Sequence, residues 1–154
     1  MASVNNLVYL MEHIAAVFGK QSDQVLQEQL GIGLSQFRIL MVLEWSPRIQ
    51  QKAIAAALGQ TEASISRQIK LLHGKGLLIT KIDPRNKRKH LTAPTTLGMQ
   101  ITEAATAIIR RNFGNDLALF ADSDFSQLYA NLQKLHKVTC QKGKLGACDH
   151  LLGF

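Results

Sequence analysis

The chain has 154 residues, 46% of them hydrophobic, and a formal net charge of +7. This length allows one domain with extensions, and the composition supports a buried core, which excludes whole-chain disorder and a fibrous fold. No apolar run approaches the roughly 18 residues of a membrane span, and the first residues do not resemble a signal peptide. We therefore expect a soluble cytoplasmic protein with no membrane partner.

Most of the positive charge lies in residues 61–92, which we call the basic segment. It holds eight Lys and Arg against two acids, a net charge of +6, whereas the rest of the chain is nearly neutral. Charge concentrated in this way is typical of phosphate binding. The alternative is a solvated charge run, but apolar residues at regular spacing within the segment favour an ordered basic surface.

The first half of the chain predicts three helices. Apolar residues at spacings of three and four predict a helix over residues 4–29, which the sequence Gly31-Ile32-Gly33 ends. Ser35 is the expected N-cap of a second helix, which ends near Pro47. An alanine-rich third helix covers Gln51–Leu58.

A fourth helix and a hairpin follow. Thr61 is the expected N-cap of the fourth helix, whose apolar residues Ile65, Ile69 and Leu72 share one face. Residues 77–82 predict a strand, Asp83-Pro84-Arg85-Asn86 a turn, and residues 89–92 the returning strand.

Two more helices complete the chain. One runs to about Phe120, and the last begins at Asp122-Ser123 with Phe125, Leu128, Leu132 and Leu135 along one side. We predict a mainly α fold with a small β-hairpin, a winged helix-turn-helix. Residues 33–94 form the winged helix, residues 1–32 and 95–140 a helical dimerisation region, and residues 141–154 a C-terminal tail.

The fourth helix and the hairpin supply the expected DNA contacts. Ser, Gln and Arg can contact base edges, and Arg and Lys can contact phosphates. On the recognition helix the candidates are Thr61, Glu62, Ala63, Ser64, Ser66, Arg67, Gln68 and Lys70. On the wing they are Asp83, Arg85, Asn86, Lys87, Arg88 and Lys89.

Residues 34–40, 55–59 and 64–78 together resemble the MarR family of winged-helix regulators. The most specific similarity is the wing, where Asp83-Pro84-Arg85 is followed by Leu91-Thr92. The resemblance covers about residues 5–138. It implies a homodimer on double-stranded DNA, with the fourth helix in the major groove, Arg85 in the minor groove, and Asp83 orienting the wing through a charge pair.

The resemblance also implies a repressor that binds a pseudo-palindromic operator and is released by a small aromatic or anionic effector. His13, Phe18 and Trp45 are candidates for the effector pocket, although aromatic residues at helical spacing more often form core. The chain departs from the family between Thr92 and Gly98, where the link into the fifth helix is longer than usual. The resemblance therefore does not fix the angle between the DNA-reading and dimer-forming parts of the molecule.

The C-terminal Cys140 and Cys148 are flanked by His136 and His150. Three interpretations stay open: ordinary tail residues, a thiol redox switch, and a zinc site of unusual spacing. We favour the first, so no metal or cofactor is expected.

Acid–base pairs, nucleophile–base pairs and a phosphate loop are not apparent, so an enzyme is not expected. The alternatives to a DNA-binding regulator are a winged-helix protein-interaction module and a thiol- or metal-responsive sensor. An outer helix face with Ser, Gln and Arg favours base reading over docking of an acidic protein.

Overall fold

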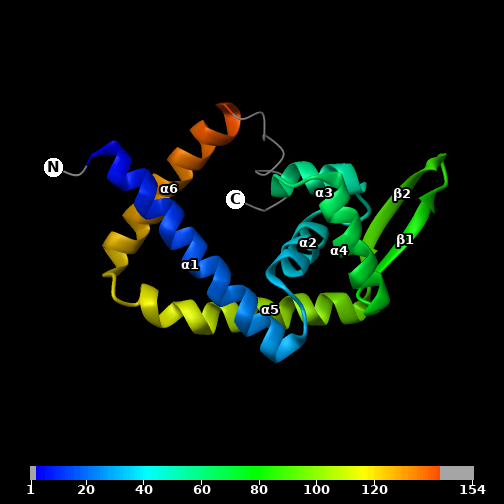
Figure 1. The fold of residues 1–154 in the computed structure, drawn as a ribbon, viewed down its shortest axis with the longest axis horizontal. Coiled ribbons are helices and arrows are strands. Elements are labelled where there is room, and N and C mark those ends of the chain that lie inside the picture. The colour runs from blue at the N-terminus through cyan, green and yellow to red at the C-terminus, as the bar shows by residue number, and fades with distance from the viewer. Residues whose placement is uncertain (1–2, 143–154) are drawn as a thin grey trace.

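The computed structural model describes residues 3–142 and confirms the predicted fold class (Figure 1). Within these residues the order is α1 (Val4–Leu30), α2 (Leu34–Trp45), α3 (Gln51–Leu58), α4 (Glu62–Gly74), β1 (Leu78–Asp83), β2 (Asn86–Pro94), α5 (Thr96–Leu117) and α6 (Asp122–Lys142). None of the described helices is long and apolar enough to cross a membrane.

The hydrophobic core lies in the winged-helix lobe, which we define as residues 26–108. Its members include Phe37, Leu40 and Leu43 of α2 and the predicted row Ile65, Ile69 and Leu72 of α4, all buried. Ala55 and Ala57 are buried too. Their small side chains let α3 approach α4 closely, as the helix-turn-helix geometry requires.

The predicted N-cap at Ser35 is wrong. The helix α2 begins at Leu34 with Gly33 as its cap residue. The backbone N–H of Leu34 donates instead to Oδ1 of Asp23 on α1, at 2.7 Å. A carboxylate from another helix therefore caps α2, which no local pattern around residue 35 could indicate.

The longer link between Thr92 and Gly98 does not form a loose hinge. Ala93 and Pro94 extend β2 and pair with Ile79 and Leu78 of β1. Thr95 then caps α5 and also donates from its hydroxyl to the carbonyl oxygen of Gly76 at 2.8 Å. The extra residues are absorbed by a strand and a cap, so α5 is anchored to the lobe.

Gly98 is needed at this junction because α5 packs closely on the backbone before β1. A Cβ atom at Gly98 would lie 2.1 Å from the carbonyl oxygen of Leu77. This contact fixes the start of α5 and hence the direction in which the helix leaves the lobe.

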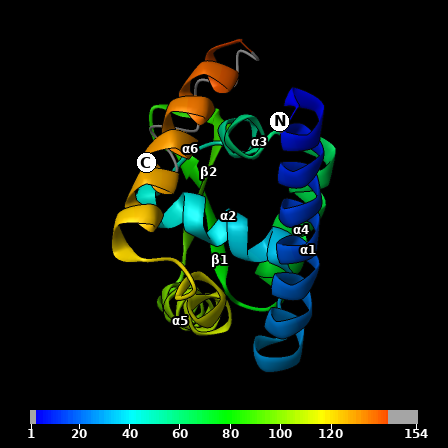
Figure 2. The same ribbon diagram turned by 90° about the vertical axis from the view of Figure 1, so that its left-hand side faces the viewer.

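Beyond the lobe, the chain leaves large apolar surfaces exposed. We call residues 4–17 of α1 together with α6 the apolar arms. Leu7 is 52% exposed, Tyr9 68% and Leu132 45%. Figure 2 shows α1 and α6 on opposite sides of the molecule, so they do not cover each other. The helix α5 ends at Leu117 rather than at Phe120, which is itself exposed.

Candidate nucleic-acid interface

The helix α4 begins where its sequence predicts. The hydroxyl oxygen of Thr61 accepts a hydrogen bond from the backbone N–H of Ser64 at 3.2 Å. Gly59 adopts a left-handed conformation with φ of 61°, which ends α3 and turns the chain toward this cap. The turn between the two helices therefore sets the position of the first exposed residues of α4.

The candidate residues of α4 differ in their exposure to solvent. Glu62, Ala63, Arg67 and Lys70 are exposed, in agreement with the prediction. The side chains of Ser64, Ser66 and Gln68, which are also candidates for DNA contact, are half-exposed.

Two of these half-exposed side chains contact neighbouring glutamines. Gln68 accepts a hydrogen bond from Gln36 of α2 at 3.2 Å, and the hydroxyl of Ser64 lies 3.5 Å from Gln60. The fully exposed part of α4 is therefore centred on Ala63, Arg67 and Lys70.

The wing turn is held by two side-chain to backbone hydrogen bonds. Oδ1 of Asp83 accepts from the backbone N–H of Arg85 at 2.9 Å, and Oδ1 of Asn86 accepts from the N–H of Arg88 at 3.0 Å. Asp83 thus orients the turn through a backbone hydrogen bond, where a charge pair was expected. The guanidinium of Arg85 stays exposed.

Three basic residues of the wing, Lys87, Arg88 and Lys89, lie at an irregularity of the hairpin. Ile82 pairs with His90 and Asp83 with Asn86, so residues 87–89 have no partner on β1. Such a bulge re-aims side chains away from the regular ladder. Lys87, Arg88 and Lys89 are all exposed there.

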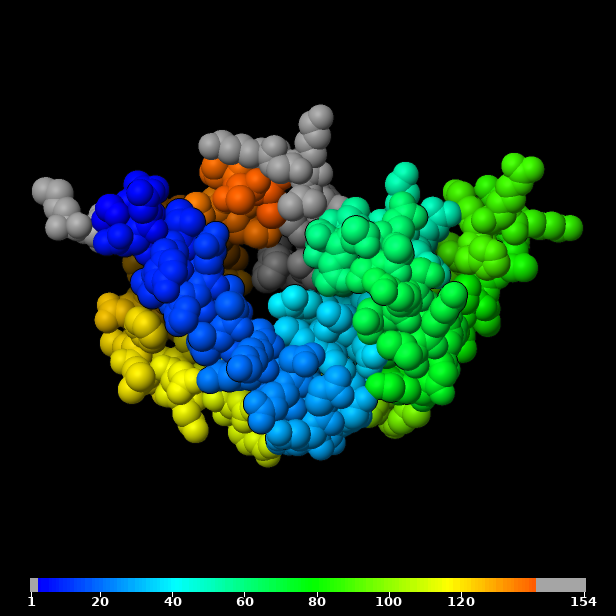
Figure 3. All heavy atoms as spheres, viewed as in Figure 1, coloured from blue at the N-terminus to red at the C-terminus, as the bar shows by residue number. Residues whose placement is uncertain are grey.

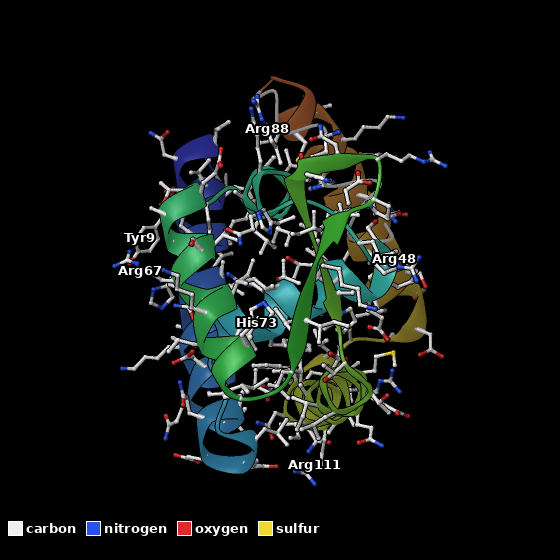
Figure 4. The ribbon with its side chains drawn as sticks, turned by 90° about the vertical axis from the view of Figure 1, so that its right-hand side faces the viewer. Tyr9, Arg48, Arg67, His73, Arg88 and Arg111 are labelled. Atoms are coloured by element: carbon white, nitrogen blue, oxygen red, sulfur yellow. The ribbon has the colours of Figure 1, made fainter. Side chains whose placement is uncertain are left out.

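The two basic elements stand together at one end of the molecule. Figure 3 shows the hairpin projecting at the end opposite the N-terminal part of α1. In Figure 4, α4 runs beside the hairpin, Arg67 lies on the outer side of α4, and Arg88 lies near the tip of the wing. The basic segment therefore forms one surface made of a helix and a strand pair.

Sequence reasoning missed three features next to this surface. Arg48 has a φ of 65°, in the left-handed region, and its backbone N–H donates to the carbonyl of Thr92 at 3.0 Å. His73 Nε2 lies 2.7 Å from the hydroxyl of Thr80, joining α4 to β1 (Figure 4). Lys75 bonds inward to Gln36. A positive φ at an arginine has no local sequence signal, since glycine is the usual residue there.

The residues proposed for an effector pocket are not brought together. His13 stacks on Tyr9 one turn earlier on α1, with ring centroids 5.9 Å apart. Phe18 packs on Phe113 of α5 at 4.6 Å. Trp45 is 58% exposed at the end of α2.

Two cavities in the described part of the chain are lined by residues other than His13, Phe18 and Trp45. One of about 590 Å³ lies between the end of α2 and α5, and one of about 350 Å³ lies between α1 and α5. The larger is lined by Glu44, Thr96, Met99, Gln100, Glu103, Thr106, Ala107 and Arg110. Its charged groups are two carboxylates and one guanidinium.

The C-terminal cysteine prediction falls partly outside the described residues. Sγ of Cys140 lies 3.1 Å from Nε2 of His136, one turn earlier on α6. Cys148 and His150 lie outside the described range. Within residues 3–142, no group of three or more metal-binding side chains comes together.

Known proteins share this arrangement. Residues 30–89 match the model of the MarR family. A putative transcriptional regulatory protein for the hcr operon of Thauera aromatica is 23% identical over 107 residues, covering 70% of this chain and 64% of that protein. The chain thus spans less than two thirds of that relative.

Solved structures extend the similarity beyond the winged helix. The MepR–DNA complex of Staphylococcus aureus is 26% identical, with a TM-score of 0.74 over 86% of this chain and 97% of MepR. A MarR/EmrR family regulator from Acinetobacter sp. ADP1 is 23% identical, with a TM-score of 0.77 over 89% of this chain and 96% of that one. The winged helix of this chain is thus similar to the MarR family, and most of the chain shares its fold with these solved structures.

Proposed function

We propose that the protein is a homodimeric transcriptional regulator that binds double-stranded DNA through α4 and the wing. The observation that carries the proposal is the basic surface of α4 and the hairpin. Arg67, Lys70, Arg85 and the bulge residues 87–89 are exposed on these two adjacent elements. The similar MepR has been solved in complex with DNA, which supports the same class of ligand here.

In this proposal α4 and the wing bind different grooves of the DNA. The helix α4 enters the major groove, where Ala63 permits close approach and Arg67 can donate to a guanine edge. The wing reaches the adjacent minor groove or its phosphates with Arg85 and the bulge residues.

We propose residues 1–32 and 95–140 as the dimerisation region, with the apolar arms as its contact surface. Residues 4–17 contain one charged residue, Glu12, yet their large apolar side chains are exposed in the single chain. A contiguous apolar surface of this kind is typical of an interface between subunits. A two-fold dimer would present two copies of α4 to one pseudo-palindromic operator.

The larger cavity is the proposed effector site, because it lies where α2 of the lobe meets α5. Its volume of about 590 Å³ suits a small molecule. Arg110 could pair with an anionic group, whereas Glu44 and Glu103 would oppose one. Ligand binding there would change the angle between lobe and arms, and so release DNA, as expected of a repressor that acts on DNA in the cytoplasm.

Selection of bound sequences from random duplex DNA, at a stated salt concentration, tests the proposal. We expect an inverted repeat whose half-sites are about 10 base pairs apart. Recovery of no motif would contradict sequence-specific binding and would favour the protein-interaction module. The acidic partner of such a module would bind the same lysines and arginines, so the DNA selection separates the two functions.

A further inference from the structure

A chain of hydrogen bonds joins the α1–α2 junction to the recognition helix. The ammonium group of Lys75, just after α4, donates to the backbone carbonyl of Gly31 and to Oε1 of Gln36, the latter at 3.0 Å. Nε2 of Gln36 then donates to Oε1 of Gln68 at 3.2 Å. Gln36 is buried, with 6% of its surface exposed. The chain therefore runs from a positive charge, through a buried amide, to a side chain of α4.

The direction of every bond in this chain follows from Lys75. An ammonium group has three donors and no acceptor, so Gln36 must turn its oxygen toward it. The NH2 group of Gln36 then faces Gln68, whose amide oxygen must accept the hydrogen bond. Lys75 thus fixes the orientation of the side-chain amides of Gln36 and Gln68, although it is not hydrogen-bonded to Gln68.

The end of the chain is the NH2 group of Gln68. Among the described residues, none is shown accepting from this group, and no buried side-chain nitrogen or oxygen lacks a partner. The nitrogen of Gln68 is therefore accessible to solvent, while its oxygen is turned toward α2. Gln68 is the central residue of α4, next to Arg67 on the helix that we propose enters the major groove.

This orientation restricts what Gln68 can recognise. A glutamine reads adenine with two bonds, its oxygen accepting from N6 and its nitrogen donating to N7. With the oxygen held toward Gln36, the outward-facing donor matches O6 of guanine or O4 of thymine, whereas adenine presents the N6 donor to it. We propose that Lys75 and Gln36 are positioning residues that hold Gln68 as a donor, so that it selects guanine or thymine over adenine in each half-site. The inference rests on the proposed DNA binding.

Selection from random duplex DNA with four full-length proteins tests this. Comparing the wild type with Gln68→Ala identifies the base position that depends on Gln68. There we expect the wild type to prefer guanine or thymine over adenine by about fivefold or more, the worth of one hydrogen bond. Lys75→Met and Gln36→Leu should each raise adenine to near equality, although Gln68 is still present.

Two further variants serve as controls. Lys75→Arg keeps a donor-only group and should restore the wild-type preference. Lys70→Met removes an exposed charge from the same helix, and should weaken binding without changing the preferred base. Together they separate the hydrogen-bond direction from charge and from general damage to α4.

Three results would overturn the inference. They are an unchanged preference in Lys75→Met, a wild-type preference for adenine at the Gln68 position, and an even loss of affinity in Gln68→Ala that marks a phosphate contact.

A wild type that selects no motif would instead contradict the proposed function, and the hydrogen-bond chain is then tested in the free protein. Proton exchange of side-chain amides, followed by NMR, should be slower for Gln36 than for Gln68. Lys75→Met should speed the exchange of Gln36 about tenfold, the effect of losing roughly 1.4 kcal/mol. Equal exchange of Gln36 in the two proteins would refute the chain itself.

Discussion

The winged-helix lobe and the apolar arms differ in how far they bury their apolar residues and in how much net charge they carry. The lobe buries its own apolar residues and carries nearly all of the net charge on its surface. The arms are nearly neutral and bury almost nothing, because no described side chain of α6 is buried. A region that is complete by itself is thus joined to one that needs a partner. The difference supports our proposal that DNA binds at the lobe and that a second copy of the chain binds at the arms.

Adding charge to the arms should have the largest effect. Leu128→Asp with Leu132→Asp places two carboxylates within the exposed apolar row of α6. We expect monomers, and DNA binding weaker by about 100-fold or more, since a dimer gains avidity from two linked contacts. Light scattering and a mobility-shift titration measure the two effects.

The matched control is Ser126→Asp with Gln133→Asp. These positions are exposed and, by helical spacing, lie on the other side of α6. The same two charges should leave the dimer and its DNA affinity nearly unchanged. If both double variants behave alike, the apolar row is not the contact surface.

Gly98 tests how firmly the arms are attached to the lobe. In Gly98→Ala the new methyl group would meet the carbonyl oxygen of Leu77, so we expect a loss of about 3 kcal/mol in unfolding free energy. Gly114→Ala, in the same helix, has open space around the added Cβ and should gain about 0.5–1 kcal/mol. Denaturant unfolding of both proteins measures the difference. Equal stabilities would show that α5 does not depend on this close approach.

Removing a wing charge should weaken binding without affecting folding. Arg85→Ala is expected to cost about 1–3 kcal/mol of DNA affinity and to lower the slope of affinity against salt by about 1. Lys20→Ala removes an exposed charge from α1, outside the lobe's basic segment, and should change neither quantity. The measurement is the DNA affinity of both variants over a range of salt concentrations. An unaltered slope in Arg85→Ala would contradict a contact between the wing and DNA.

The smallest effect is expected at the cap of α4. Thr61→Ala removes the acceptor for the N–H of Ser64 and should lower stability by about 1 kcal/mol. Thr61→Ser keeps a hydroxyl oxygen and should behave almost like the wild type. Thermal unfolding of the pair measures the cap, and equal melting temperatures would mean that the hydroxyl does not stabilise α4.

Local sequence signals were sufficient for most of the lobe. Thr61 and Gly59 act through their immediate neighbours, so the start of α4 and the end of α3 could be predicted. The same holds for the row Ile65, Ile69 and Leu72, because helical spacing places these residues on one face. The wing was located by its turn residues, although β2 is longer than predicted.

The features that could not be predicted share a non-local cause. The cap of α2 comes from Asp23 on another helix, and the half-burial of Gln68 reflects contact with Gln36, 32 residues away. The lining of the larger cavity combines Glu44 of α2 with residues of α5, which no aromatic pattern could indicate. Contacts between distant segments are visible only once the fold brings the segments together.

The mass of the protein in solution, alone and with one operator duplex, tests the comparison between lobe and arms most directly. Light scattering should give twice the chain mass of 17.0 kDa without DNA, and two chains bound per duplex. A stable particle of one chain mass at micromolar concentration, or one chain per duplex, would contradict the role given to the apolar arms.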